Sequence, residues 1–185
     1  KGVRIGIKLP DTVNIMIEEE SVVYAIKSSD GQWWMMDSDG RVVEQANNAK
    51  AATATQVLGV TLEAPTVNEK GVATEMTPSE TNELGELIPV TTTGAQRLTA
   101  ALQILKALEN NDIVGEAASV DVTSTEDIIL WYGTRYQVNL GDTSRLDYKV
   151  DCMNDAILQM SDYQSGVLDI SFTIWPNQVG YTPFA

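Results

Sequence analysis

The sequence predicts an α+β domain, in which two amphipathic helices cover a strand-rich, largely antiparallel and curved sheet, preceded by a β-hairpin. Short segments of alternating apolar residues recur along the chain between turn residues. Two longer segments repeat apolar residues at spacings of three and four. Because a helix with one apolar face needs a surface to cover, we expect both helices to pack on the apolar face of the sheet.

The N-terminal part reads as a series of strands. Apolar residues alternate over 3–7 and 13–17, on either side of a turn at 9–11, which predicts a hairpin with one apolar face. An isolated hairpin is marginal in water, so we expect this face to pack on something. Further strands are expected at 22–26, 33–36, 41–44 and 56–63, with turns at 28–31 and 37–40 and a polar stretch at 45–55.

Residues 64–86 are rich in Thr, Glu, Pro and Gly and lack periodicity, so we expect a long surface loop. The first helix carries its stripe from Leu98 to Leu108 and the second from Leu146 to Met160. Ser144 followed by Asp147 predicts a capping box at the start of the second helix. The remaining strands are expected at 118–122, 128–132, 136–140, 167–174 and 179–184.

Composition disfavours several classes of function. The 185 residues include 12 Lys and Arg against 26 Asp and Glu, a formal net charge of −14. This charge disfavours binding to nucleic acid and to anionic lipid. The chain has no histidine, the commonest general base and transition-metal ligand. Its single cysteine, Cys152, rules out an intrachain disulfide, and we interpret it as a small buried or half-buried apolar residue.

The acidic motifs favour structure over chemistry. Residues 37–40 (DSDG) begin like a calcium loop but lack its later acidic positions, so a hairpin turn is the better interpretation. The run at 18–20 (EEE) is read as a solvated strand end rather than a cation site. No carboxylate pair is singled out for glycoside hydrolysis. We therefore predict no catalytic residue, metal site or cofactor.

Two aromatic pairs, Trp33-Trp34 and Trp131-Tyr132, suggest a sugar-stacking platform as one interpretation. Neighbouring side chains in a strand point to opposite faces, so one of Trp33 and Trp34 is expected in the core and the other at least partly exposed. Packing in strands is the favoured interpretation of both pairs.

The C-terminal strands give the clearest functional hypothesis. Residues 167–174 alternate throughout, residues 175–178 interrupt the pattern, and 179–184 resume it. Pro183 has no N–H to donate to a ladder, which places it at a sheet edge or beyond the sheet. An edge strand presents unpaired backbone groups that can accept a partner's strand. The other interpretation is that this edge is short or covered.

Four stretches together resemble the extracytoplasmic region of the DivIB/FtsQ cell-division family. Residues 8–15 (KLPDTVNI) resemble the hairpin that closes its POTRA domain, and residues 34–42 (WMMDSDGRV) resemble the meander that follows. Residues 87–94 (LIPVTTTG) resemble the approach to the first helix of its β domain. Residues 140–142 (LGD), Lys149 and residues 166–170 (GVLDI) resemble its closing strand, helix and strand.

The resemblance implies two domains: residues 1–20 as the end of a POTRA domain and residues 21–185 as a β domain with a loop insertion at 64–86. The chain also opens inside a strand pattern, so we expect it to be a fragment of a longer protein. Its single membrane-spanning anchor would lie upstream, in the cell membrane at the division septum. The sequence departs from the family at 18–21 (EEES), where relatives often have Glu-Arg-x-Pro. It also lacks, at 139–141 (NLG), the extra basic residue that some members carry before the helix.

By this resemblance the chain is a non-catalytic scaffold. Family members recruit division proteins of the FtsB/DivIC and FtsL type, and their last strands receive the partner by strand addition. The matching positions give the expected protein-binding residues: Leu168, Ile170, Phe172, Val179, Tyr181 and Phe184. Buried aromatic residues often anchor interfaces, which favours Phe172 and Tyr181 as the main contacts.

Two alternatives stay open on the sequence. One is a cell-wall (peptidoglycan)-binding module or weak glycan-active enzyme that uses Trp33 or Trp34 and a carboxylate pair. The other is a secreted or surface-displayed structural domain with no dedicated partner strand. A last strand whose free edge is already capped would favour the second.

Overall fold

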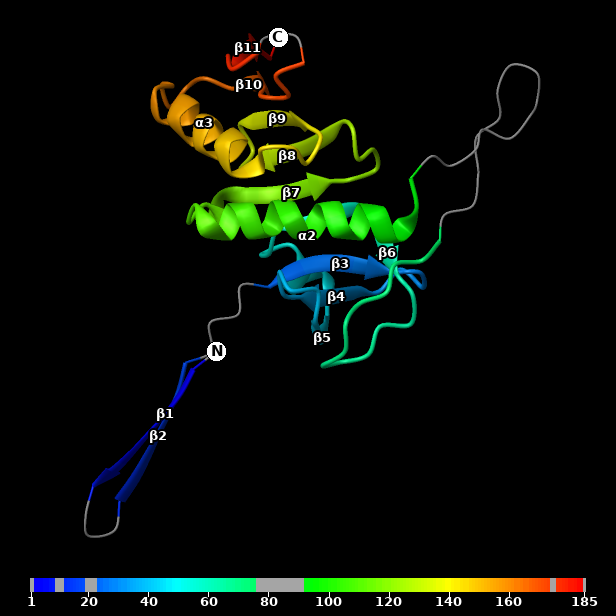
Figure 1. The fold of residues 1–185 in the computed structure, drawn as a ribbon, viewed down its shortest axis with the longest axis vertical. Coiled ribbons are helices and arrows are strands. Elements are labelled where there is room, and N and C mark those ends of the chain that lie inside the picture. Colours follow the sequence, from blue (N-terminus) through cyan, green and yellow to red (C-terminus); the bar gives the residue numbers. More distant parts are fainter. Residues whose placement is uncertain (1, 9–11, 19–22, 76–91, 174–175, 185) are drawn as a thin grey trace, which may run out of the picture.

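The computed structural model describes residues 2–8, 12–18, 23–75, 92–173 and 176–184. Within them, nine strands form one mixed, mostly antiparallel sheet in the order β11-β10-β9-β8-β7-β6-β3-β4-β5 (Figure 1). The predicted α+β architecture is confirmed. Parallel pairing joins β6 to β3 and β7, and β9 to β10. The strands are β3 (Tyr24–Ser28), β4 (Trp33–Met36), β5 (Val42–Ala46), β6 (Gln56–Leu62), β7 (Ala117–Asp121), β8 (Ile128–Tyr132), β9 (Tyr136–Gly141), β10 (Gly166–Asp169) and β11 (Gly180–Pro183).

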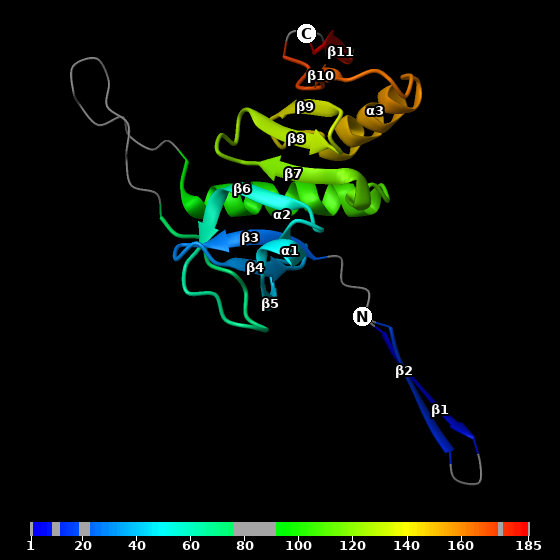
Figure 2. The ribbon, with the colours of Figure 1, turned by 180° about the vertical axis from the view of Figure 1, so that it is seen from behind.

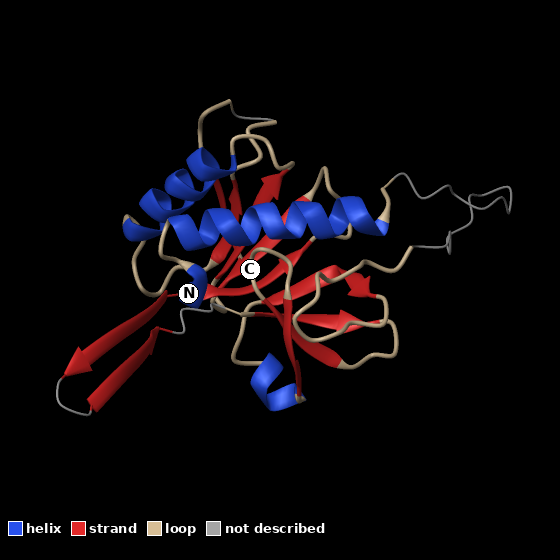
Figure 3. Cartoon of the chain, turned by 60° about the horizontal axis from the view of Figure 1, so that its bottom comes forward, coloured by secondary structure: helices blue, strands red, loops and turns tan. Residues whose placement is uncertain are grey.

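Both predicted helices are present and lie on the same face of the sheet (Figures 1 and 3). They are α2 (Gly94–Asn110) and α3 (Leu146–Leu158). Their apolar stripes bury Leu98, Leu105, Val150 and Met153 in one core with the helix-facing strand residues. Each such side chain contributes about 1.5–3 kcal/mol when it leaves water. Packing therefore stabilises the layered arrangement that periodicity predicted.

The opposite face carries a smaller cluster beneath β3–β5. Here α1 (Asn48–Ala51) packs Ala51 against Ala25 and Met35 (Figure 2). The helix lies inside the stretch expected to be merely polar. Asn47 caps it by accepting a hydrogen bond from the backbone N–H of Lys50 at 2.9 Å. A short 3-10 turn, η1 (Val114–Glu116), leads into β7.

Residues 2–8 and 12–18 pair as the predicted hairpin strands, a two-stranded sheet of β1 (Gly2–Lys8) and β2 (Thr12–Glu18) (Figure 1). Its turn at 9–11 lies outside the described residues, and so do Glu19 and Glu20 of the acidic run. The expected contacts of its apolar face involve side chains that are not described. The loop was expected at 64–86, and its described part makes two isolated bridges to residues outside it. Lys70 pairs with Arg41, and Ala73 pairs with Leu62.

The predicted capping box of the second helix is wrong. Arg145 is the N-cap of α3, with a left-handed φ of 55° and no side-chain capping bond. The Ser144 backbone N–H and hydroxyl both donate to Asp142 Oδ1, at 3.1 and 2.5 Å. The Ser144 hydroxyl is thereby occupied before the helix begins. A true capping box occurs at α2, where Thr93 and Gln96 exchange hydrogen bonds.

Buried Lys149 ties α3 to the end of β9. Its side chain is 1% exposed. The ammonium donates to the carbonyls of Leu140 and Asp142 and to Asp142 Oδ1, each at 2.8 Å. All three ammonium protons thus have acceptors, which is what burial of a charge requires. The loop between β9 and α3 is fixed by this contact.

Candidate partner-binding edge at the C-terminal strands

The last strand, β11, is the outermost strand at one end of the sheet (Figure 1). It pairs antiparallel with β10, and Leu168 lies opposite Tyr181. The prediction that Pro183 belongs to an edge strand is confirmed. This strand end is therefore where backbone groups can meet another chain.

The hydrogen bonding of β11 defines which groups face outward. The Phe184 N–H donates to the Ser165 carbonyl of the adjoining chain at 3.2 Å. In an antiparallel pair, residues bonded to the neighbouring strand alternate with residues that face away. Thr182 therefore faces β10, while Tyr181 and Pro183 face outward. The free edge offers the Tyr181 N–H and the carbonyls of Tyr181 and Pro183, and the missing N–H of Pro183 falls on the side where it costs no sheet bond.

The two ends of the sheet differ. At the β5 end, a loop covers Val42: its N–H donates to the Glu69 carbonyl and its carbonyl accepts from the Asn68 N–H, both at 2.8 Å. Along β11, no backbone hydrogen bond from another described residue reaches the outer edge. The loop thus caps the start of β5, whereas the described residues leave the outer backbone groups of β11 unbonded.

Two of the six expected contact residues belong to the core instead. Leu168 and Ile170 are fully buried. The alternation of β10 turns Leu168 toward the helices, and the Ile170 N–H extends the pairing to the Asn139 carbonyl at 2.8 Å. Their side chains have no exposed surface for a partner. They hold β10 in place beside the edge.

The expected strand at 167–174 ends early, at Asp169. Asp169 Oδ1 accepts hydrogen bonds from the N–H and the hydroxyl of Ser171, at 3.0 and 2.7 Å. This local turn competes with the sheet ladder and stops the strand. Phe172 then takes a left-handed φ of 59°, which redirects the chain.

Phe172 joins a cluster at the start of α3. Its ring centroid lies 5.6 Å from that of Tyr148, and the Arg145 guanidinium carbon lies 4.4 Å from the Tyr148 ring centroid. Arg145 also donates to Asn177 Oδ1 at 3.0 Å. Arg145, Phe172 and Asn177 all have left-handed backbones. Such strain persists only where neighbouring contacts enforce it, so the cluster holds the turn that returns the chain to the edge as β11.

The other expected contacts flank the edge on both faces. Val179 and Tyr181 are half-buried against the helix-side core, and the Tyr181 hydroxyl donates to the Ser165 carbonyl at 3.1 Å. Phe184 is 43% exposed and stacks on Trp131, with ring centroids 6.2 Å apart. The sequence had singled out Trp131 for a sugar platform and not for this site. Strand order brings Trp131 to this end of the sheet, because only β9 and β10 lie between β8 and β11.

The residues that the sequence suggested for a glycan site or a metal site pack or turn in other ways. Trp34 packs on the helix-side core and Trp33 on the opposite cluster, both half-buried, so the two cannot form one stacking platform. The turn interpretation of 37–40 is confirmed: the Gly40 N–H donates to the Asp37 carbonyl at 2.9 Å. Among the described residues, no group of three His, Cys, Asp or Glu side chains is placed to hold a metal ion.

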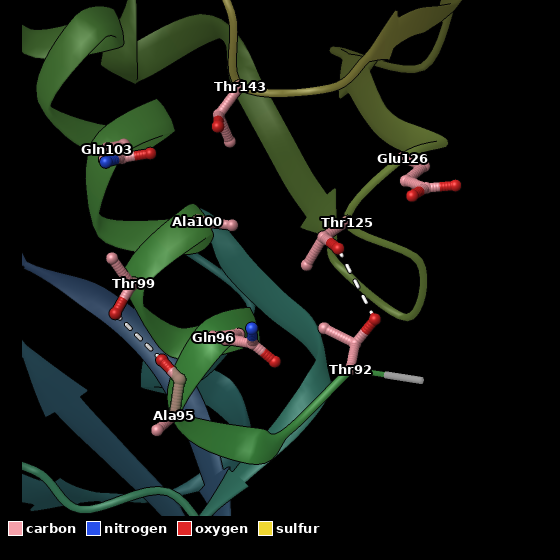
Figure 4. Close-up of a pocket in the computed structure, with 9 residues that line it drawn as sticks. All are labelled: Thr92, Ala95, Gln96, Thr99, Ala100, Gln103, Thr125, Glu126 and Thr143. Atoms are coloured by element: carbon pink, nitrogen blue, oxygen red, sulfur yellow. Dashed lines mark hydrogen bonds between the residues drawn. The ribbon is translucent and has the colours of Figure 1, made fainter. Parts of the chain in front are cut away.

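A groove of about 470 Å³ lies between α2, the loop that joins β7 to β8, and Thr143 (Figure 4). Neutral Thr, Ala and Gln side chains make most of its walls, and Glu126 is the one carboxylate among the described lining residues. Thr92 and Thr125 approach across it, their hydroxyl oxygens 3.5 Å apart. This lining lacks the pair of carboxylates that glycoside hydrolysis uses.

Comparison of the sequence with protein-family models gives no match. A search among curated proteins also gives none. In the part of the chain that is described, no helix has both the length and the apolar character needed to cross a membrane. The interpretation of the site therefore depends on its geometry.

Proposed function

We propose that this chain is a non-catalytic extracytoplasmic scaffold domain that binds a partner by adding the partner's strand beside β11. The observation that carries the proposal is the position of β11, outermost in the sheet and with its outer backbone groups unbonded by other described residues. Strand addition takes its affinity from such backbone groups and its specificity from flanking side chains.

The side chains beside the edge suit this mode of binding. Phe184 and Trp131 offer an aromatic surface on one face, and Tyr181 lies on the other. Aromatic residues are enriched among the anchors of protein interfaces. Pro183 limits the edge to a short stretch, which favours a short partner segment over open-ended sheet extension.

The proposed partners follow from the resemblance to the DivIB/FtsQ family. They are division proteins of the FtsB/DivIC type, together with FtsL-type proteins. In this proposal the domain lies outside the cell membrane at the division septum, held by a single-pass anchor, with residues 1–20 as the end of a POTRA domain and 21–185 as the β domain. A cell-wall contact is the second candidate, and the opposed positions of Trp33 and Trp34 support it less well.

Calorimetric titration tests the proposal. The extracytoplasmic segment of the source organism's DivIC-type protein, alone and with its FtsL-type partner, is expected to bind saturably. A Tyr181→Ala, Phe184→Ala double variant that remains folded is expected to bind at least about tenfold more weakly, because aromatic anchors carry much of an interface's binding energy.

A Val67→Ala, Val72→Ala variant is the matched control, because both valines are exposed and lie in the chain that follows β6. It should bind like the wild type. Equal loss in both variants, or unchanged binding by the aromatic variant, contradicts a partner site at the C-terminal strands.

A further inference from the structure

A second pocket lies at an irregularity of β6, away from β11. In the pairing of β3 with β6, Ile26 faces Val57 but Lys27 faces Thr61, so residues 58–60 bulge out of the ladder. Gly59 has a φ of 82° at this bulge, and a Cβ there would lie 2.3 Å from the Thr123 backbone nitrogen. Bulges of this kind often re-aim side chains near functional sites.

The bulge opens a pocket of about 270 Å³. Val57, Leu58 and Val60 give it largely apolar walls. Arg97 from α2 and Lys27 from β3 also line it, and among the described residues no Asp or Glu does. The Lys27 ammonium lies over the Trp33 ring, 5.0 Å from its centroid, so Arg97 is the cation that the pocket offers to a ligand. In a chain with a formal net charge of −14, a pocket lined by a cation and by no described acid favours an anionic ligand.

Arg97 is 9% exposed and has incomplete hydrogen bonding. One terminal nitrogen donates to the Gly59 carbonyl at 3.1 Å, while the buried Nε has no partner among the described residues. No described carboxylate lies within ion-pair distance of the guanidinium. Asp121, on the adjacent strand β7, accepts from the Thr123 N–H instead.

Lys149 shows how this fold satisfies a buried cation. Its ammonium has three acceptors, one of them the Asp142 carboxylate. Arg97 is nearly as buried but lacks a carboxylate among the described residues. An ionised side chain removed from water without a counter-charge is costly, so an anion that enters this pocket gains a desolvated, charge-assisted hydrogen bond.

We propose that the pocket binds a carboxylate carried on an apolar stem, with Arg97 as its donor. The guanidinium fork matches the planar geometry of a carboxylate. The apolar walls accommodate a hydrocarbon stem, which favours such a ligand over free phosphate. Both a small aliphatic acid and the C-terminus of a peptide ending in an apolar residue have this chemistry.

Calorimetry and thermal unfolding with hexanoate test the proposal, with hexanamide as the uncharged control. Hexanoate is expected to bind the wild type and raise its unfolding midpoint, since a ligand that binds only the folded state stabilises it. Hexanamide should do neither. Acetyl-glycyl-leucine against its C-terminal amide then separates the peptide source from the small acid. Absence of binding by both carboxylates overturns the proposal.

Arg97→Met removes the charge while keeping a side chain of similar length. It should weaken carboxylate binding by about 10- to 100-fold, the loss of a hydrogen bond to a charged group. Without ligand it should unfold at the same midpoint as the wild type or higher, because an uncompensated buried charge is gone. Lys106→Met, on the exposed part of α2, should not change carboxylate binding.

The chain itself is another source of carboxylates, because Glu80, Glu83 and Glu86 precede α2 in the sequence. A variant with all three changed to Gln distinguishes this case. Equal binding of hexanoate by the wild type and this variant supports an external ligand. Binding by the variant alone overturns the proposal in favour of an internal carboxylate.

Discussion

Lys149→Ala is expected to lower the free energy of unfolding by about 2–4 kcal/mol, because a buried hydrogen-bond acceptor left without its donor costs about 1–3 kcal/mol. The substitution leaves the Leu140 and Asp142 carbonyls without their donor and opens a space between β9 and α3. Urea unfolding measures the loss. Lys149→Met fills more of the space without the charge, so we expect it to cost less. A loss below about 1 kcal/mol for Lys149→Ala would contradict the role of this contact.

The same pair predicts a pH dependence. The hydrogen bond from Lys149, with further bonds from Ser144, lowers the pKa of the Asp142 carboxyl from 3.8 to about 2. Because the folded-state pKa is the lower one, this stabilisation is fully present above about pH 4 and is lost as pH falls toward 2. Asp142 is 57% exposed, so solvent screening makes the contribution small. In Lys149→Met, the difference in stability between pH 5 and pH 2 should shrink.

Tyr181→Pro is expected to weaken partner binding by about tenfold more than Tyr181→Ala does. Both variants lack the phenol ring, but only the proline lacks the outward N–H that an added strand would use. Leaving one backbone acceptor of the partner unpaired costs about 1–3 kcal/mol. Pro183 already occupies the next outward-facing position of β11, so the strand accommodates proline in this orientation.

Calorimetric titration of the two variants, with their unfolding midpoints as the control for folding, measures the difference. Thr182→Pro serves as the opposite control, because Thr182 faces β10 and its loss should destabilise β11 itself. Equal affinity of Tyr181→Pro and Tyr181→Ala would show that the partner binds through side chains without pairing its backbone to β11.

Periodicity predicted much of this fold because the core depends on it. The helix stripes and most strands lie where apolar residues recur at the spacing of one face. The spacing of apolar residues carries no information about hydrogen bonds between neighbouring side chains. Asp169 stops β10 through its bonds to Ser171, and Asp142 occupies Ser144 before α3 begins. The four-residue α1 is too short to show a stripe.

The candidate site was predictable only in part. Pro183 indicated an edge strand before the sheet order was known. Alternation alone did not reveal that Leu168 and Ile170 face the helices, since that depends on which face the helices cover. The contact between Trp131 and Phe184 joins residues more than 50 positions apart, and it follows from strand order, which no local pattern encodes.

Amide hydrogen exchange of the Tyr181 N–H, with and without the partner's extracytoplasmic segment, tests strand addition most directly. In the free domain this amide faces outward and should exchange quickly, whereas the Thr182 amide, which faces β10, should be protected. Binding is predicted to slow exchange at Tyr181 by at least about tenfold. Saturable binding that leaves the Tyr181 amide in fast exchange would contradict strand addition at β11.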